Sequence, residues 1–399
     1  MFRGTVIAQI IAVLVGVYLA KLYGEKAYGY LGVFLSIIAI TSAVATLQLD
    51  KCIVISKKEE ESKNWFNFNL VLIPVTISLC FLVFFFFSGL FRLKQVTTTI
   101  FCLSFFGSMI VTYNLINDSY FTYRKQFLII SNTKIITTIC NVIFQFGMYY
   151  YYKNIGLIIG YLLSQIILLI YCFYKNKKSI TRVNFNDIKK GIKENKTIIK
   201  YLLPSNTINT IANHLMPILL LAFFDAEKAG VYFFSIKLLG VPLFLISSSI
   251  SQVYFQKSSE LINRNNTELL KITKKIILSN ILIMILFLLA INTLGTYFLN
   301  LYFENKWENL NTYIFTLSFL ILARSCFNPI SSLIVVLNKN LIGLFFNSYL
   351  FIVNLIALYF GVINNEIMHT IIILAIFGAI GYVILMFYFL NLLKINRSV

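Results

Sequence analysis

Residues 24–31 read GEKAYGYL, and residues 226–233 read AEKAGVYF. At an offset of 202 the triplet Glu25-Lys26-Ala27 matches Glu227-Lys228-Ala229, Ala20 matches Ala222, and Tyr30 matches Tyr232. Each copy is a short polar stretch between two long apolar segments. The match is short, but its placement indicates a chain built as two halves on one plan.

Apolar segments occupy most of the chain on both sides of these motifs. Of the 399 residues, 59% are hydrophobic and 12% charged, and the mean hydropathy is +0.82. A membrane-spanning helix needs about 20 apolar residues. The sequence therefore predicts an all-α integral membrane protein with about twelve transmembrane helices, the first of them a retained span and not a cleaved signal peptide. The predicted spans are 4–23, 29–48, 69–90, 97–117, 127–150, 155–174, 201–224, 229–253, 276–299, 311–337, 341–363 and 367–391.

The distribution of basic residues predicts the orientation. Of the 34 Lys and Arg residues, seven follow odd-numbered spans, 24 lie at the chain ends or follow even-numbered spans, and three lie within spans. Because cytoplasmic loops are enriched in Lys and Arg, both termini of this multi-pass protein are predicted to be cytoplasmic. The net charge of +19 is then a topology signal and a source of contacts with lipid headgroups, and we expect no nucleic-acid partner.

The densest basic segment divides the chain. Residues 175–200 hold nine Lys and Arg, which is typical of a solvated cytoplasmic linker; a regulatory or lipid-sensing role is the alternative. The predicted domains are a six-helix bundle at 1–174, the linker at 175–200 and a second six-helix bundle at 201–399. Two halves with an even number of crossings enter the membrane from the same side, so a parallel pseudo-twofold axis and a central cavity are expected, an organisation that favours transport by rocking of the bundles.

Three cations lie within predicted spans: Lys134, Lys237 and Arg324. A charge at the bilayer centre costs about 2.5–3.5 kcal/mol on insertion scales, so each needs a partner or a wet cavity. No carboxylate lies deep in a span, since Asp50 and Asp118 fall at cytoplasmic span ends. Cations in a wet cavity favour an anionic substrate, and phosphate accepts strong bonds from both Lys and Arg.

Amides and hydroxyls follow these cations at helical spacing, in two stripes formed by Lys134, Thr138, Asn141 and Gln145 and by Arg324, Asn328 and Ser331. A third amide face lies on the seventh span, where Pro217 could kink the helix. Such faces suit sugar hydroxyls, although amides also join helices to one another. The candidate polar substrate-binding residues are Asn206, Asn209, Asn213, His214, Asn141, Gln145, Asn328 and Gln9.

At this point the chain resembles the Wzx-type O-antigen flippases, which are polysaccharide transporters of the superfamily that includes MATE exporters and MurJ-type lipid II flippases. The stretches that carry the resemblance are GTVIAQIIAVLVGVYLAKLYGEKAYGYLGVFLSIIAITSAVATLQLDKCIV at 4–54, YLLPSNTINTIANHLMPILLLAFFDAEKAGVYFFSIKLLGVPLFLISSSISQVYF at 201–255 and, more weakly, 301–334. The resemblance implies two six-helix bundles around a cavity with cationic walls, one of them carrying Lys237. It further implies a location in the bacterial inner membrane and translocation of undecaprenyl-diphosphate-linked repeat units from the cytoplasmic to the periplasmic leaflet, with a polysaccharide polymerase and a chain-length regulator as candidate partners.

Two other functions stay open. An O-antigen polymerase, which is a membrane glycosyltransferase, resembles this chain in size but carries a large external loop, whereas the external loops predicted here have about 4 to 11 residues. A MATE-type drug/cation antiporter tends to carry a carboxylate deep in its first span, where this chain has Gln9. No catalytic triad, metal-ligand spacing or phosphate-binding glycine loop is recognisable, so we expect a transporter without catalytic residues, metal or cofactor.

Overall fold

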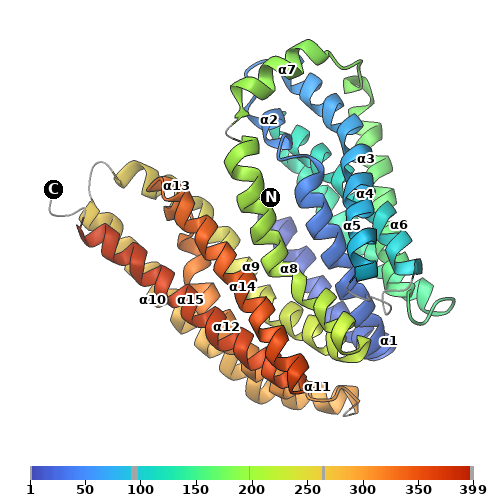
Figure 1. The fold of residues 1–399 in the computed structure, drawn as a ribbon, viewed down its shortest axis with the longest axis vertical. Helices are drawn as coiled ribbons and strands as arrows, with labels where there is room; N and C mark the ends of the chain where they lie inside the picture. Colours follow the sequence, from blue (N-terminus) through green and yellow to red (C-terminus); the bar gives the residue numbers. More distant parts are fainter. Residues whose placement is uncertain (1, 91–97, 197, 263–265, 305, 396–399) are drawn as a thin grey trace. The chain divides into compact units, whose positions relative to one another are not determined.

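The computed structural model describes the backbone of residues 2–90, 98–196, 198–262, 266–304 and 306–395, with side chains except at 2–13, 87–90, 241–249 and 252. The regular structure of these residues is helical (Figure 1). Contacts between Cα atoms divide the chain into two compact units, Met1–Gly230 and Val231–Val399. The α-helices are α1 Phe2–Ala45, α2 Asp50–Ile55, α3 Glu59–Leu90, α4 Thr98–Tyr123, α5 Phe127–Tyr149, α6 Gly156–Asn176, α7 Phe185–Glu194, α8 Leu203–Phe223, α9 Ala226–Leu261, α10 Asn266–Ala290, α11 Thr296–Phe303, α12 Leu310–Phe327, α13 Leu333–Val336, α14 Asn340–Ile363 and α15 Ile367–Ile395.

Nine helical segments among the described residues are long and apolar enough to cross a membrane, and the protein is therefore a multi-pass, all-helical membrane protein. The sequence predicted about twelve spans. One difference arises because α1 holds the first two predicted spans in a single segment. The other two differences are the spans predicted on α8 and α9, which are not among the nine. The three amides of α8 lower its mean hydropathy, and α9 includes residues 241–249, whose side chains lie outside the described part of the structure. The finer number of twelve stays a prediction.

The first quoted motif lies at a break inside α1. Gly24 has φ 76° and ψ 177°, which is outside the helical region, so one helix ends before it and another begins at Glu25. The Tyr28 hydroxyl donates to the Gly16 carbonyl oxygen at 2.6 Å. In a straight helix, two residues twelve positions apart are separated by about 18 Å along the axis, which is too far for this hydrogen bond. The chain therefore reverses its direction between Gly16 and Tyr28. Glycine permits this reversal because it has no Cβ to oppose a positive φ.

The two quoted motifs contact each other. A Cβ added to Gly29 would overlap the carbonyl oxygen of Ala226, and one added to Gly230 would overlap that of Glu25. The contact is reciprocal, as two copies around a local twofold axis would make. It pairs residues at an offset of 201, one less than the offset of the sequence match, because the second helix of each copy begins at Glu25 and at Ala226.

Buried hydroxyl groups join α1 to α4 in the first unit. Thr41 and Ser108 lie 2.7 Å apart between their hydroxyl oxygens, and Thr112 donates to Ser42 at 3.0 Å. The Asn114 amide similarly donates to the Gln165 side chain at 3.0 Å between α4 and α6. Small polar residues let helices approach closely and bond to each other in lipid. These amides and hydroxyls therefore hold helices together.

The basic segment after α6 packs against the body of the first unit. The Asn67 side chain donates to the Ser179 carbonyl at 3.0 Å, and the Asn64 side chain donates to that of Asn184 at 3.0 Å. Gly191 of α7 faces the ring of Trp65, which is 2% exposed. Helix α7 therefore lies on the end of α3 at which α3 begins (Figure 1). The solvated linker expected from charge alone is in this part a docked helix, because one face of α7 is apolar.

In the second unit α15 packs against α12 and α14. Close approaches are made by Gly378, where an added Cβ would lie 2.7 Å from Leu320, and by Gly361, which faces Thr370. Helix α12 ends at Phe327, followed by a 3-10 turn over Asn328–Ile330. The span predicted at 311–337 is thus interrupted, since Pro329 has no N–H to continue the helix.

Candidate functional site

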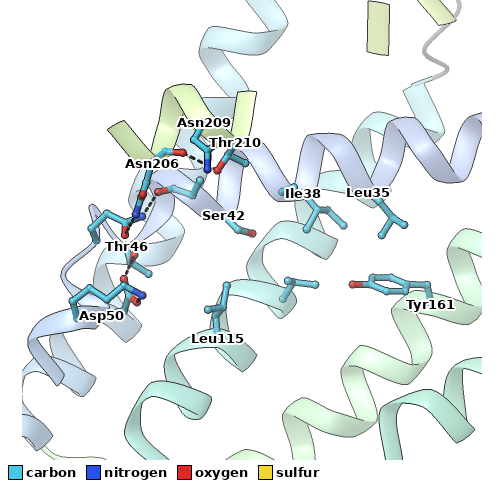
Figure 2. Close-up of a pocket in the computed structure, with 15 residues that line it drawn as sticks. Leu35, Ile38, Ser42, Thr46, Asp50, Leu115, Tyr161, Asn206, Asn209 and Thr210 are labelled. Carbon is cyan, nitrogen blue, oxygen red and sulfur yellow. Dashed lines mark hydrogen bonds and ion pairs between the residues drawn. The ribbon is translucent and has the colours of Figure 1, made fainter. Parts of the chain in front are cut away.

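A cavity of about 430 Å³ lies in the first unit, at the end where the second helix of α1 stops. Its lining comes from α1, the turn after α1, α2, α4, α6 and α8. Figure 2 shows polar side chains of α1, α2 and α8 at one end and Leu35, Ile38 and Tyr161 at the other, with Leu115 between them. The full lining is Leu35, Ile38, Ala39, Ser42, Ala43, Thr46, Gln48, Asp50, Lys51, Val111, Leu115, Tyr161, Asn206, Asn209 and Thr210.

A strained turn shapes the polar end. Leu47 and Gln48 have φ of 51° and 60°, a left-handed conformation that costs about 1–2 kcal/mol for a residue with a side chain. The Gln48 side chain compensates in part, because its Nε2 donates to the Ala43 carbonyl at 3.0 Å, near the end of α1. Leu49, 1% exposed, anchors the turn in the core.

The same Gln48 amide connects α1 to α8. Asn206 Nδ2 donates to Gln48 Oε1 at 2.9 Å, so Gln48 uses its two polar ends on two different helices. One turn of helix beyond Asn206, the hydroxyl of Thr210 donates to the backbone carbonyl oxygen of Asn206 at 2.8 Å. Asn209 accepts at its Oδ1 a bond from Asn213 Nδ2 at 2.9 Å. The amide face of α8 is therefore held in a fixed arrangement toward the cavity.

Two opposite charges lie side by side in the lining. Asp50, 4% exposed, accepts a bond from the Thr46 hydroxyl at 2.7 Å, and its other oxygen lies 3.2 Å from Lys51 Nζ. Next to them, burial raises the pKa of the Cys52 thiol to about 12, and the negative charges of Asp50 and Glu61 add to this shift. The thiol therefore stays protonated and chemically inert at neutral pH.

Of the polar residues singled out from the sequence, Asn206 and Asn209 line this cavity. Asn213 lies one turn further along α8 and supports Asn209, and His214 follows it with an exposed side chain. Gln145 is buried and bonds through its Nε2 to the Leu157 carbonyl at 3.1 Å, so it joins α5 to α6. Asn141 is half-buried on α5, and Gln9 lies outside the residues whose side chains are described.

Lys134 differs from the expectation of a cation without a nearby carboxylate. Its charge acts on the carboxyl group of Asp118, on the last turns of α4. Lys134 lies in the second turn of α5, so both groups sit near the same end of the unit. A cation whose charge acts on a nearby carboxyl group is already compensated in part, and Lys134 does not line the cavity.

The other two cations lie in the second unit. Lys237 has an exposed side chain on α9. Arg324 is half-buried near the end of α12, its Nε is buried with no hydrogen-bond partner among the described residues, and its charge acts on the buried hydroxyl group of Tyr232. The stripe of Arg324, Asn328 and Ser331 does not continue as a helix, since the Ser331 hydroxyl donates to the Asn328 carbonyl across the 3-10 turn at 2.7 Å.

Sequence reasoning missed the polar residues that α1, the turn after it and α2 contribute to the cavity, which are Ser42, Thr46, Gln48, Asp50 and Lys51. A signal was present in the polar residues Thr46, Gln48, Asp50 and Lys51, which lie at the end of the span predicted at 29–48 and directly after it. The left-handed turn that brings these side chains to α8 carries no glycine and has no sequence mark. Across the part of the chain that the structure describes, no group of three or more His, Cys, Asp or Glu side chains could hold a metal ion.

Comparison with solved structures identifies the fold. The chain is similar to an inward-facing multidrug resistance MATE family transporter of the MOP superfamily, with a TM-score of 0.77, 12% identity, and coverage of 98% of this chain and 96% of the other. It is also similar to the lipid II flippase MurJ in an inward closed conformation, with a TM-score of 0.75, 14% identity, and coverage of 97% and 86%.

A third similar structure is a MOP superfamily transporter from Pyrococcus furiosus, with a TM-score of 0.61, 13% identity, and coverage of 100% and 94%. No curated protein matches the sequence. The family model described as "Polysaccharide biosynthesis protein" matches residues 2–312. The chain therefore belongs to the polysaccharide biosynthesis protein family and has the MATE- and MurJ-like fold of the MOP superfamily.

Proposed function

We propose that this protein is a flippase that translocates undecaprenyl-diphosphate-linked O-antigen, or related polysaccharide repeat units, from the cytoplasmic to the periplasmic leaflet of the bacterial inner membrane. The observation that carries the proposal is the divided lining of the cavity, with amides and hydroxyls at one end and aliphatic side chains at the other (Figure 2). Membership of the polysaccharide biosynthesis family supports a substrate of this class.

The divided lining suits a molecule with a hydrated glycan and an apolar chain. Sugar hydroxyls lose their bonds to water when they enter the membrane, and this costs free energy unless protein groups replace the water. Asn206, Asn209 and Thr210 supply donors and acceptors at the depth where α8 begins. The polyprenyl chain needs no such replacement and remains in lipid, so only the head of the substrate has to cross through the protein.

Lys237 and Arg324 are assigned to the diphosphate. Arg324 keeps a buried Nε without a hydrogen-bond partner among the described residues, and a buried donor left unsatisfied costs about 1–3 kcal/mol. A phosphate oxygen would satisfy it with a charge-assisted bond. Lys134 is a weaker candidate because its charge already acts on the carboxyl group of Asp118.

The wider organisation belongs to the same proposal. Twelve spans in two six-helix bundles, with both termini in the cytoplasm, would move the substrate by alternating access, without covalent chemistry. A polymerase and a chain-length regulator that receive the units on the periplasmic side are the proposed protein partners.

The test is complementation of a host from which the gene for this protein has been deleted. We expect the deletion to abolish surface polysaccharide and to leave the lipid-linked unit in the cytoplasmic leaflet. Lys237→Ala and Arg324→Ala should fail to restore surface polysaccharide at normal protein levels, whereas Lys153→Ala, which removes an exposed cation between α5 and α6, should restore it. Undiminished polysaccharide in both site variants would contradict their assignment.

The same strain separates the two alternatives. Loss of a polymerase would leave single repeat units already exposed in the periplasmic leaflet, whereas loss of a flippase keeps them on the cytoplasmic side. Loss of a drug/cation antiporter would change drug susceptibility and leave the polysaccharide intact. Periplasmic exposure of the accumulated unit would therefore overturn the flippase assignment.

A further inference from the structure

The cavity of the first unit has hydrogen-bond groups that its own contacts do not use. Asn206 donates one side-chain N–H to Gln48, and the side-chain oxygen of Asn209 accepts a bond from Asn213. Within the described structure this leaves the Asn206 side-chain oxygen, Oδ1, and both side-chain N–H groups of Asn209 for a ligand. A ligand that both donates and accepts at neighbouring atoms fits this set, and vicinal hydroxyl groups of a sugar do so.

The opposite side of the cavity suits the apolar face of a sugar ring. Tyr161 of α6 lines it, and its ring is held edge-on against Phe34 with centroids 5.9 Å apart. Leu35 and Ile38 line the same end of the cavity (Figure 2). A pyranose has C–H groups on its faces and hydroxyls at its rim, so aromatic and aliphatic groups can contact the faces while amides bond to the rim.

The charges of the lining do not favour an anion. Asp50 and Lys51 are its two charged residues, and they lie 3.2 Å apart as an ion pair. Their charges compensate, so the cavity offers no net attraction to a phosphate or a carboxylate group. A diphosphate would gain more from Lys237 or Arg324 than from this cavity.

We propose that this cavity is a subsite for a neutral sugar residue of the transported unit, with Asn206 and Asn209 as the specificity-determining residues. This inference rests on the proposed flippase function and adds that the sugar and the diphosphate are recognised by different parts of the chain. The volume of about 430 Å³ lies near the lower end of the range of about 300–1,000 Å³ for small-molecule sites. It therefore suits a mono- or disaccharide and not a whole repeat unit.

The experiment measures binding of three synthetic probes to the full-length protein in lipid nanodiscs by isothermal titration calorimetry. The probes are a short-chain polyprenyl diphosphate without sugar, the same lipid carrying N-acetylglucosamine, and the same lipid carrying glucuronic acid. We expect the neutral-sugar probe to bind about tenfold more tightly than the bare probe, and the acidic-sugar probe to gain no affinity. Each hydrogen bond contributes a factor of about two to ten.

Asn206→Ala and Asn209→Ala should each reduce the gain from the neutral sugar by about two- to tenfold and leave the bare probe unaffected. Asn209 is exposed, so its truncation leaves the core unchanged even if loss of Asn206 disturbs the bond to Gln48. Asn132→Ala, which removes an exposed amide of α5 outside the lining, is the matched control and should bind all probes as the wild type does. Lys237→Ala and Arg324→Ala should weaken all three probes alike.

The outcomes separate the two proposals. If the bare probe binds but the sugar adds nothing in the wild type, or if Asn206→Ala and Asn209→Ala both keep the full gain, the sugar subsite is wrong and the flippase function stands. If none of the probes binds to the wild type, the proposed function fails together with the subsite. Tighter binding of the acidic-sugar probe would contradict the neutral class.

Discussion

At the scale of single residues, glycines decide how the first helices meet. Gly24 permits the reversal inside α1, and Gly29 and Gly230 let two helix backbones touch. The closest atoms at the latter two positions are backbone carbonyl oxygens of the facing helix. A flexible side chain could move away from a larger residue, but a helix backbone moves only as a whole. The crossing therefore tolerates no side chain at these two positions.

Gly29→Ala or Gly230→Ala should lower the thermal stability of the purified protein. In each variant the new methyl group overlaps a backbone oxygen of the facing helix, so the helices must separate and lose packing. The midpoint of thermal unfolding in detergent measures this loss.

Gly147→Ala is the matched control for this prediction. Gly147 also lies inside a helix, but an added Cβ would meet nothing within 4 Å. Alanine is preferred to glycine in a helix by about 0.5–1 kcal/mol, so this variant should unfold at the same temperature as the wild type or slightly higher. Equal stability of Gly29→Ala and Gly147→Ala would disprove the close crossing.

At the scale of elements, α7 shows how a basic segment can be part of the folded body. Ile188 and Gly191 are buried on one face of α7, while Lys189, Lys190 and Lys193 are exposed on the other. The rings of Phe68 and Phe185 extend the contact, with centroids 6.4 Å apart. The charged face satisfies the positive-inside pattern, and the apolar face holds the helix on α3. Charge density alone therefore could not distinguish a solvated linker from a docked helix.

Gly191→Leu should release α7. A Cβ at this position would lie 2.6 Å from the Trp65 ring, and Trp65 is packed too tightly to move aside. Release would expose the backbone around Lys190 and Lys193, so trypsin should cut this segment faster than in the wild type. The appearance of cleavage products with time measures the change.

Asn186→Leu adds a side chain of the same size to an exposed position of the same helix. It should leave the cleavage rate unchanged, because it removes no contact with α3. Equal rates in Gly191→Leu and the wild type would mean that α7 is not held through this face.

At the scale of the whole molecule, the distribution of charge predicts which side of the membrane each end of a helix occupies. Basic residues cluster around α7, while the loop between α5 and α6 holds Lys153 as its one basic residue. Since Lys and Arg are retained on the cytoplasmic side, α7 should be cytoplasmic and this loop periplasmic.

Reporter fusions test this orientation. A fusion at Asn186 should be active with a cytoplasmic reporter and silent with a periplasmic one, and a fusion at Lys153 should give the opposite pattern. Matched cytoplasmic and periplasmic reporters at both positions check expression. The reverse pattern would invert the topology and, with it, the direction of transport in the proposed function.

Much of this protein could be predicted from the sequence because hydropathy and charge act locally along the chain. The apolar segments predict helices in a membrane, the fold was recognised through residues 4–54 and 201–255, and the family was confirmed over residues 2–312. The α8 amides were also found, because their helical spacing places them on one face. These properties depend on a residue and its near neighbours, which a sequence displays directly.

The tertiary structure decided which polar residues meet. Gln145 and Asn206 look alike in the sequence, yet Gln145 joins α5 to α6 while Asn206 lines a cavity and bonds to Gln48. The charge of Lys134 acts on Asp118, a residue of another helix. A polar side chain in a membrane helix either bonds to a neighbouring helix or lines a cavity. Which of the two it does depends on whether the neighbouring helix places a hydrogen-bond partner within reach. That depends on turns such as Leu47–Gln48, whose left-handed backbone is imposed by packing and carries no mark in the sequence.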